Sequence, residues 1–127
     1  MKKTLLLATA LCALASPAMA QSVVDEYLAY IGPDDLYNSN GDRLTLPWQI
    51  IRQDRANFHR FGIQDPDDEG DSFFASARNR DRMERMLRNG QISPSAARAV
   101  VRGDVYVYVQ VWGEGNTGNF VSVEVVQ

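Results

Sequence analysis

The chain has 127 residues, of which 45% are hydrophobic and 23% are charged, and its formal net charge is −3. This length suits one small domain and excludes a multidomain enzyme, and the hydrophobic content is too high for a disordered chain. No apolar run approaches the ~20 residues that a membrane-spanning helix needs, which excludes a membrane channel.

The first 20 residues have the pattern of a secretory signal. Lys2 and Lys3 form a basic start, residues 4–15 are apolar or small, and Ala18-Met19-Ala20 is an A-x-A cleavage site. We therefore expect residues 1–20 to be removed. Residues 21–127 are then a single small globular domain, exported by a bacterium to the periplasm or secreted.

The charge and cysteine content of the exported domain follow from this cleavage. Cys12 is the only cysteine, so its loss leaves a domain without a disulfide or thiol chemistry. Because Lys2 and Lys3 are removed as well, the net charge of −3 becomes −5. A chain of this sign is poorly suited to bind duplex nucleic acid, and we expect no nucleic-acid partner.

Three elements are expected before residue 65. Ser22 is placed to cap a helix over residues 22–30. Asn38-Ser39-Asn40-Gly41 is a turn, and its flanks could form a small hairpin that adds a third strand from residues 36–44. A second helix is expected from Thr45 or Leu46 to about Phe61, because Pro47 suits its first turn and Gly62 ends it.

The middle of the chain predicts an acidic loop and two further helices. Residues 65–71 contain five acids with Pro66 and Gly70, a composition typical of a loop. A third helix is expected over residues 72–88, with acids before its start and arginines near its end. Ser93-Pro94 predicts a short fourth helix that ends at Gly103.

The C-terminal segment gives the clearest pattern in the chain. Valines alternate with polar and aromatic residues over 105–112 and again over 120–126, which predicts an antiparallel β-hairpin. The register that keeps the odd-numbered valines on one face pairs Val111 with Val121 and leaves residues 115–117 as the loop. The fold class is therefore α+β: three to four short helices followed by a C-terminal hairpin.

Asp54 is a candidate for a buried charge. On a helical projection it falls in the middle of the apolar face of the second helix, where a carboxylate needs a partner. Arg80 occupies the corresponding place on the third helix, so we expect a structural Asp54–Arg80 ion pair. The alternative is a catalytic carboxylate with a raised pKa, used with His59 in a small secreted hydrolase.

A second stripe of the same helix is a candidate ligand site. Trp48, Arg52, Arg55 and His59 combine an indole, two guanidinium groups and an imidazole, which suit an anionic or sugar-like ligand. The simpler interpretation is an exposed shoulder whose arginines pair with acids. With one histidine and, after cleavage, no cysteine, a histidine-based zinc site is not expected.

The acidic loop also suggests calcium binding. Its carboxylates Asp65, Asp67, Glu69 and Asp71 are candidate metal ligands, because carboxylate oxygens bind calcium. An EF-hand loop would place Ser72 and Ser76 where an apolar residue and a bidentate glutamate are required. We therefore expect a solvated acidic turn, with no metal and no cofactor.

The second face of the hairpin carries the aromatic residues Tyr106, Tyr108, Trp112 and Phe120. Such a row could bind a glycan or a protein, or pair with a second copy through the hairpin edge to form a dimer. The alternative is that the N-terminal helix covers this face with the apolar residues Val23, Val24, Tyr27, Leu28 and Ile31. Valines on one face and aromatic residues on the other favour this alternative, because they are typical of a sheet buried on both faces.

Together these features predict an exported binding or protein-interaction domain with an unidentified protein or glycan partner in the cell envelope. A hydrolase and a protein inhibitor that acts through the 113–119 loop are the alternatives. An enzyme would need a concave site with convergent polar groups, which the sequence does not reveal.

Overall fold

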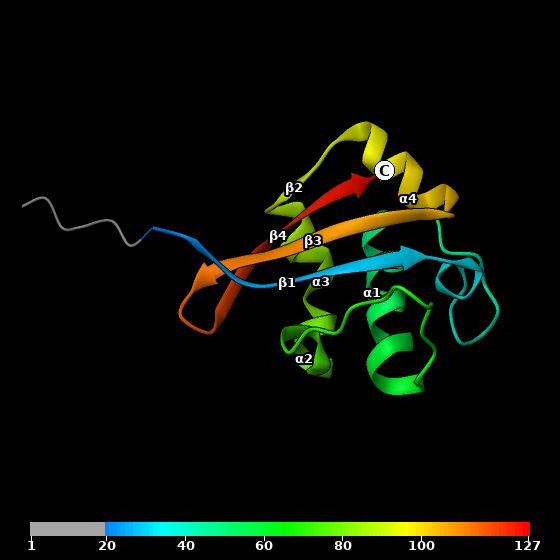
Figure 1. Ribbon diagram of the computed structural model, residues 1–127, viewed down its shortest axis with the longest axis horizontal. Helices are drawn as coiled ribbons and strands as arrows, with labels where there is room; N and C mark the ends of the chain where they lie inside the picture. Colours follow the sequence, from blue (N-terminus) through cyan, green and yellow to red (C-terminus); the bar gives the residue numbers. More distant parts are fainter. Residues whose placement is uncertain (1–19) are drawn as a thin grey trace, which may run out of the picture.

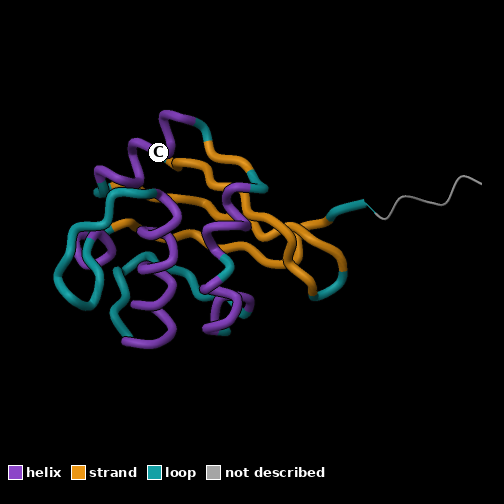
Figure 2. Tube along the Cα trace, turned by 180° about the vertical axis from the view of Figure 1, so that it is seen from behind, coloured by secondary structure: helices purple, strands orange, loops and turns teal. Residues whose placement is uncertain are grey.

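The computed structural model describes residues 20–127. One four-stranded sheet forms one layer, and the helices pack against one of its faces as a second layer (Figures 1 and 2). The strands are β1 (Ser22–Ile31), β2 (Gln91–Ile92), β3 (Val105–Glu114) and β4 (Thr117–Val126). Their order is β1-β3-β4-β2; β3 pairs antiparallel with β1 and β4, and β2 pairs parallel with β4.

The α+β class is confirmed, but the predicted N-terminal helix is wrong. Residues 22–31 form β1, whose residues Tyr27, Ala29 and Ile31 are buried at alternate positions. Pairing with β3 along nearly its whole length overrides the local preference of the segment. This strand also occupies the place that residues 36–44 were expected to take, whereas those residues form only an isolated bridge, Tyr37 to Arg43.

The predicted hairpin and its register are confirmed over most of their length. Val111 pairs with Val121 and Trp112 with Phe120. At the tip, however, Glu114 lies opposite Thr117, so the loop has two residues rather than three and the register shifts beside Trp112. Gly115 opens this turn with φ +58, and two-residue turns that begin with such a glycine match the twist of paired strands.

The second and fourth predicted helices are confirmed, and the third is interrupted. The helices are α1 (Pro47–Ala56), α2 (Ala77–Asp81), α3 (Met83–Arg88) and α4 (Pro94–Arg102), with short 3₁₀ turns at Pro33–Leu36 and Phe73–Ala75. A π-helical turn, Asn57–Phe61, continues α1 as far as Gly62. The break after Ala75 arises because the Ser76 side chain accepts a hydrogen bond from Asn79 N and so starts a new helix.

The core lies between the helices and the inner face of the sheet. Five valines of the hairpin, all odd-numbered, are buried there: Val107, Val109, Val111, Val121 and Val123. Ile50 and Ile51 of α1, Met83 and Met86 of α3 and Val100 of α4 cover them. Each fully buried aliphatic side chain contributes about 1.5–3 kcal/mol through removal from water.

The opposite face, called the outer face here, is not covered by any element of residues 20–127 (Figure 1). The predicted helical cover is wrong because the segment that was to supply it forms β1 in the sheet itself. None of the helices in residues 20–127 is long and apolar enough to cross a membrane.

Candidate functional site

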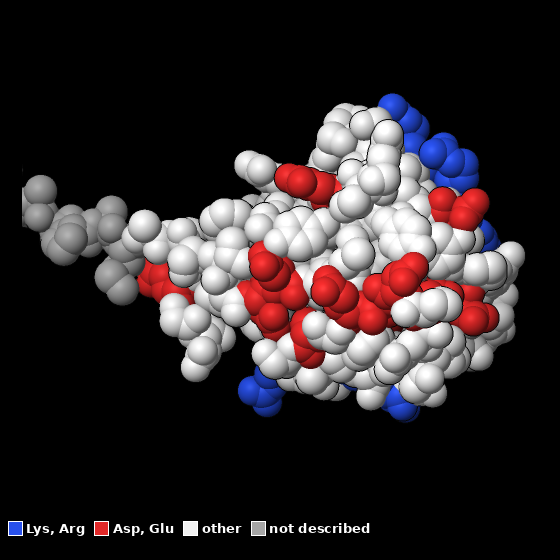
Figure 3. Space-filling model, in the orientation of Figure 1, with Lys and Arg blue, Asp and Glu red and all other residues white. Residues whose placement is uncertain are grey.

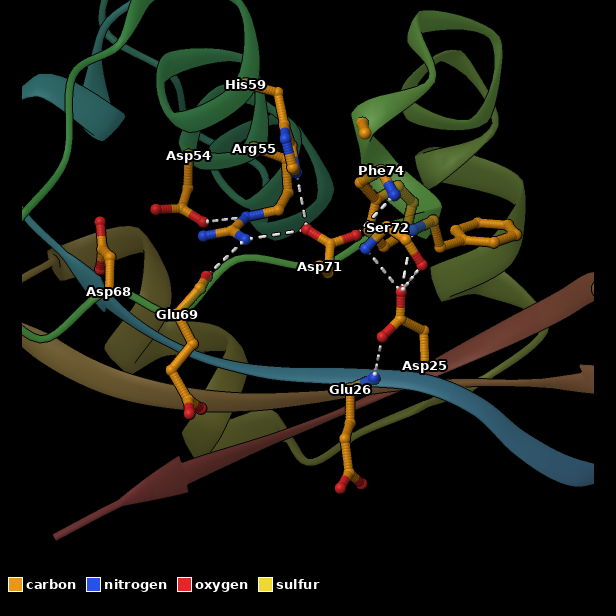
Figure 4. A network of polar contacts seen from close by, with 12 residues as sticks. Asp25, Glu26, Asp54, Arg55, His59, Asp68, Glu69, Asp71, Ser72 and Phe74 are labelled. Atoms are coloured by element: carbon orange, nitrogen blue, oxygen red, sulfur yellow. Dashed lines mark hydrogen bonds and ion pairs between the residues drawn. The ribbon is translucent and has the colours of Figure 1, made fainter.

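Arg55 is the centre of a buried polar network (Figure 4). Its side chain is fully buried, and its Nε donates to Asp54 Oδ2 at 2.7 Å. Its Nη1 donates to Asp71 Oδ1 and to the Glu69 carbonyl, each at 3.0 Å. The guanidinium group lies 3.8 Å from the centre of the Tyr27 ring, a cation–π contact. Arg55 thus joins α1, the acidic loop and β1.

The buried position predicted for Asp54 is confirmed, but the partner predicted for it is wrong. Asp54 is 2% exposed and is bonded to Arg55, its neighbour in sequence. Arg80 instead donates to the carbonyls of Phe74 and Ala75, at 2.8 and 3.1 Å. The cause is the break before α2, which leaves the carbonyls of the preceding 3₁₀ turn without helical donors.

The stripe predicted as a ligand site is divided among three environments. Trp48 packs against the core, and Arg55 is buried. Arg52 is exposed and pairs with Asp81 at 2.7 Å. The His59 Nε2 atom bonds to Asp71 Oδ1 at 2.7 Å. These residues therefore do not form a single surface for a ligand.

Arg55 is bonded to two buried carboxyl groups, and the pKa of one of them, Asp54, is raised. Burial raises that pKa to about 8, Arg55 opposes the shift, and the charges of Asp35 and Asp68 add to it. Burial likewise raises the pKa of Asp35 to about 6, against the hydrogen bonds that it accepts from Asn57 and from Gly32 N.

A carboxyl group with a raised pKa could act as a general acid, but only where a substrate reaches it. Asp54 lies under Arg55 with 2% exposure, and His59 is bonded to Asp71. The main hollows on the surface of residues 20–127 are lined by other residues. The geometry of Asp54 and His59 therefore gives no support to a hydrolase.

The acidic loop closes the free edge of β1. Leu28 N donates to a carboxylate oxygen of Glu69, and Tyr30 N donates to one of Asp68, both at 2.8 Å. Glu69 N in turn donates to the Leu28 carbonyl at 2.8 Å. Farther along the strand, Asp25 accepts bonds from Ser72 N and Phe73 N. The carboxylates thus satisfy backbone groups that an edge strand otherwise exposes.

This arrangement corrects the prediction of a merely solvated acidic turn. Asp71 faces inward to Arg55, and Asp67 accepts the Tyr106 hydroxyl at 2.9 Å. Asp65 and Glu69 do not belong to a metal-binding cluster, because within residues 20–127 no three histidine, cysteine, aspartate or glutamate side chains are placed to hold a metal ion.

The outer face presents a row of half-buried aromatic side chains. These residues are Tyr30, Tyr106, Tyr108, Trp112 and Phe120. Three of them were predicted as ligand-binding residues, namely Tyr106, Tyr108 and Trp112, and the structure places them on this one face. Tyr30 is not among the predicted residues, because the sequence predicts a helix for its segment; as part of β1, Tyr30 lies on the outer face.

Each tyrosine of this row donates its hydroxyl to a carboxylate. Tyr30 donates to Asp104, Tyr106 to Asp67 and Tyr108 to Glu26. The bond to Asp104 is the main cause that raises the pKa of Tyr30 to about 12.

Acidic residues gather on the side of the molecule that carries the outer face, and arginine appears only at its rim (Figure 3). Glu26, Asp67 and Asp104 are fixed there by the tyrosines, and Asp68 and Glu69 line the β1 edge. The face therefore combines aromatic surface with negative charge.

Two hollows lie beside this face or apart from it, and the larger one shares Tyr106 and Asp104 with it. An open groove of about 1190 Å³ runs between β4, β2 and α4. A smaller hollow of about 510 Å³ is bordered by the exposed side chains of Tyr37, Phe61 and Ile63. The 113–119 loop forms the tip of the β3–β4 hairpin and lines neither of them.

The fold and these surfaces define a small α+β domain with an open, acidic and aromatic sheet face. No known protein family, curated protein or solved structure matches the chain.

Proposed function

We propose that the protein is an exported, non-enzymatic binding domain whose outer face holds a basic segment of a partner protein. The observation that carries this proposal is the row of uncovered aromatic side chains whose hydroxyl groups lie against carboxylates. Tyrosine and tryptophan are the residues that most often supply binding energy at protein interfaces.

The charge of the face selects a cationic partner. A lysine or arginine side chain laid over Tyr106 or Tyr108 would gain a cation–π contact and lie close to Asp67 or Glu26. The net charge of −5 after signal cleavage would speed the encounter with a basic partner. An acidic partner would be repelled by the same groups.

The Trp112–Phe120 pair gives specific support to a glycan as a second candidate. The two rings are nearly parallel and stacked, with an interplanar angle of 5° and centroids 6.0 Å apart. An outward ring face of such a pair suits the flat face of a sugar ring, and neighbouring carboxylates can accept bonds from sugar hydroxyls.

Binding of labelled deca-arginine to residues 21–127, measured by fluorescence anisotropy, tests the basic partner. Tyr108→Ser and Trp112→Ser should each weaken binding by about tenfold, because aromatic contacts of this kind contribute ~1–2 kcal/mol. Both variants should unfold close to the wild-type denaturant concentration, since these side chains lie on the face that no element of residues 20–127 covers. Tyr37→Ser, which removes an exposed aromatic residue elsewhere, is the matched control and should bind normally.

If deca-arginine bound through charge alone, Tyr108→Ser and Trp112→Ser would bind it as tightly as the wild type does. That result would contradict the proposal. Loss of stability in these variants would assign the row to the core instead. Binding of chitotetraose that is sensitive to Trp112→Ser, without binding of deca-arginine, would identify a glycan-binding face.

Export is proposed from the N-terminal pattern, which lies outside the described residues except for Ala20. The mature protein should begin at Gln21, as shown by N-terminal sequencing and intact mass after expression with the full leader. A lipid-modified product that begins at Cys12 would contradict cleavage after Ala20. A product that retains Met1 in the cytoplasm would contradict export.

A further inference from the structure

The two edges of the sheet differ in how far their backbone groups are bonded. The edge of β1 is closed by Asp68 and Glu69, as described above. The edge of β4 is paired with β2 only at Ser122 and Val123. Beyond that point, at residues 124–126, no other strand of residues 20–127 pairs with this edge. An unpaired edge of this kind is a template for the addition of another strand.

The backbone of Val125 is directed into the open groove beside this edge. A Cβ on Gly90 would lie 1.7 Å from the Val121 carbonyl oxygen, so this carbonyl points away from β3, toward the chain that forms β2. Alternate residues of a strand point their N–H and C=O groups to the same side. Val125 therefore presents both groups to the groove of about 1190 Å³ that it lines.

The far wall of this groove, called the edge groove here, is made by α4. Ala96 and Ala99 line it, and both are more than nine-tenths buried. Ile92 and Val105 complete an apolar floor. Side chains of a strand alternate between the two faces of a sheet, so alternate residues of an added strand would point toward this floor. Aliphatic side chains suit the floor best, since it offers small and branched apolar groups.

One end of the edge groove is positively charged. Arg102, in the last turn of α4, lines the groove, and Arg98 borders the hollow next to it. Neither arginine has a carboxylate within ion-pair distance among residues 20–127. Asp104, which also lines the groove, is bonded to Tyr30. Glu124 also lines the groove, so its charge is mixed, and Arg102 is the one lining cation of residues 20–127 that an acidic group of an occupant could reach.

We propose that the edge groove binds an extended segment of a partner protein, which adds to β4 as a fifth strand. The Val125 backbone pairs with the segment, an aliphatic side chain of the segment packs between Ala96 and Ala99, and an acidic side chain of the segment reaches Arg102. This site is centred on the β4 edge and α4, although Tyr106 and Asp104 border both it and the outer face.

Selection from a phage-displayed library of random heptapeptides on residues 21–127 tests this proposal. Enriched peptides should share alternate aliphatic residues and an acidic residue. Val125→Pro removes the outward N–H and should abolish their binding, because proline is tolerated on an edge only where the missing N–H bonded to nothing. Ala99→Leu fills the floor without changing the backbone and should weaken binding at least about tenfold, a loss of ~1.4 kcal/mol. Ala97→Leu, on the same helix but outside the edge groove, is its control.

Three results would overturn the proposal. The first is enrichment of no peptide above the level found with Val125→Pro. The second is binding of the enriched peptides that survives Ala99→Leu, which remains informative if Val125→Pro fails to fold. The third is a wild-type dimer, seen by light scattering, that Val125→Pro converts to a monomer, because a second copy would then occupy the edge. Tyr108→Ser tests the outer face alone, because Tyr108 does not line the edge groove. This variant should bind the enriched peptides as the wild type does, whether or not it binds deca-arginine.

Discussion

Replacing Arg55 by alanine is expected to lower the free energy of unfolding by about 3–5 kcal/mol, the usual cost of removing one partner from a buried ionic network. Asp54 and Asp71 would lose their shared donor, and the Glu69 carbonyl would lose a hydrogen bond. The contact between the guanidinium group and the Tyr27 ring would be lost as well. Urea denaturation of residues 21–127 measures this change.

Arg52→Ala is the matched control, one turn earlier in the same helix. Its ion pair with Asp81 is exposed on both sides, so the variant should lose less than about 1 kcal/mol. Arg55→Lys should not restore stability, because an ammonium group cannot bridge two carboxylates in the plane of a fork or stack on Tyr27. Equal losses in Arg55→Ala and Arg52→Ala would contradict the central place of Arg55 in the core.

Local signals predicted the elements whose ends and faces are defined by neighbouring residues. In α4, a serine that accepts a backbone bond, a proline in the first turn and a glycine at the end all agree. In the hairpin, the alternation of valines sets the register, because a shift by one residue would expose the buried side chains. These features act over a few residues, so sequence alone reveals them.

The β1 strand and the network partners depend on contacts between distant segments. In residues 22–31, apolar positions at 24, 27, 28 and 31 fit a helix, whereas 27, 29 and 31 fit a strand. Pairing with β3 decides between the two patterns, and that pairing joins opposite ends of the chain. A helical projection likewise could not show that Arg55 turns inward, because its partner Asp71 and its stacking ring Tyr27 lie on other elements.

The role of the acidic loop was hidden for the same reason. Five acids over residues 65–71 suggest solvent or a cation when the loop is considered alone. Once residues 22–31 form an edge strand, the carboxylates of Asp68 and Glu69 are acceptors for its free N–H groups. Because the sequence predicts a helix instead of β1, it also cannot predict that Tyr30 joins the tyrosine row or that the two edges of the sheet differ.

Asp54→Asn is expected to change how stability depends on pH. The pKa of Asp54 is about 8 in the folded protein, because burial raises it, and about 3.9 in an unfolded chain. Between these values the folded state binds the proton more tightly. The stability that this proton contributes is full at low pH and is lost as the pH rises through the folded-state pKa.

Unfolding free energies of the wild type and of Asp54→Asn, measured by urea denaturation from about pH 4 to pH 9, therefore diverge. The wild type should lose about 1.4 kcal/mol per pH unit relative to the variant until the pH reaches the folded-state pKa. Asp35, whose pKa burial raises to about 6, contributes a slope of the same sign to both proteins, so the difference reports mainly Asp54. An asparagine at position 54 can still accept the bond from Arg55 Nε.

A constant difference across the range would mean that Asp54 stays ionised in the core, with Arg55 balancing the charges of both Asp54 and Asp71. A difference that grows with pH would mean that the buried network is neutral near pH 7, with Arg55 balanced by Asp71 alone.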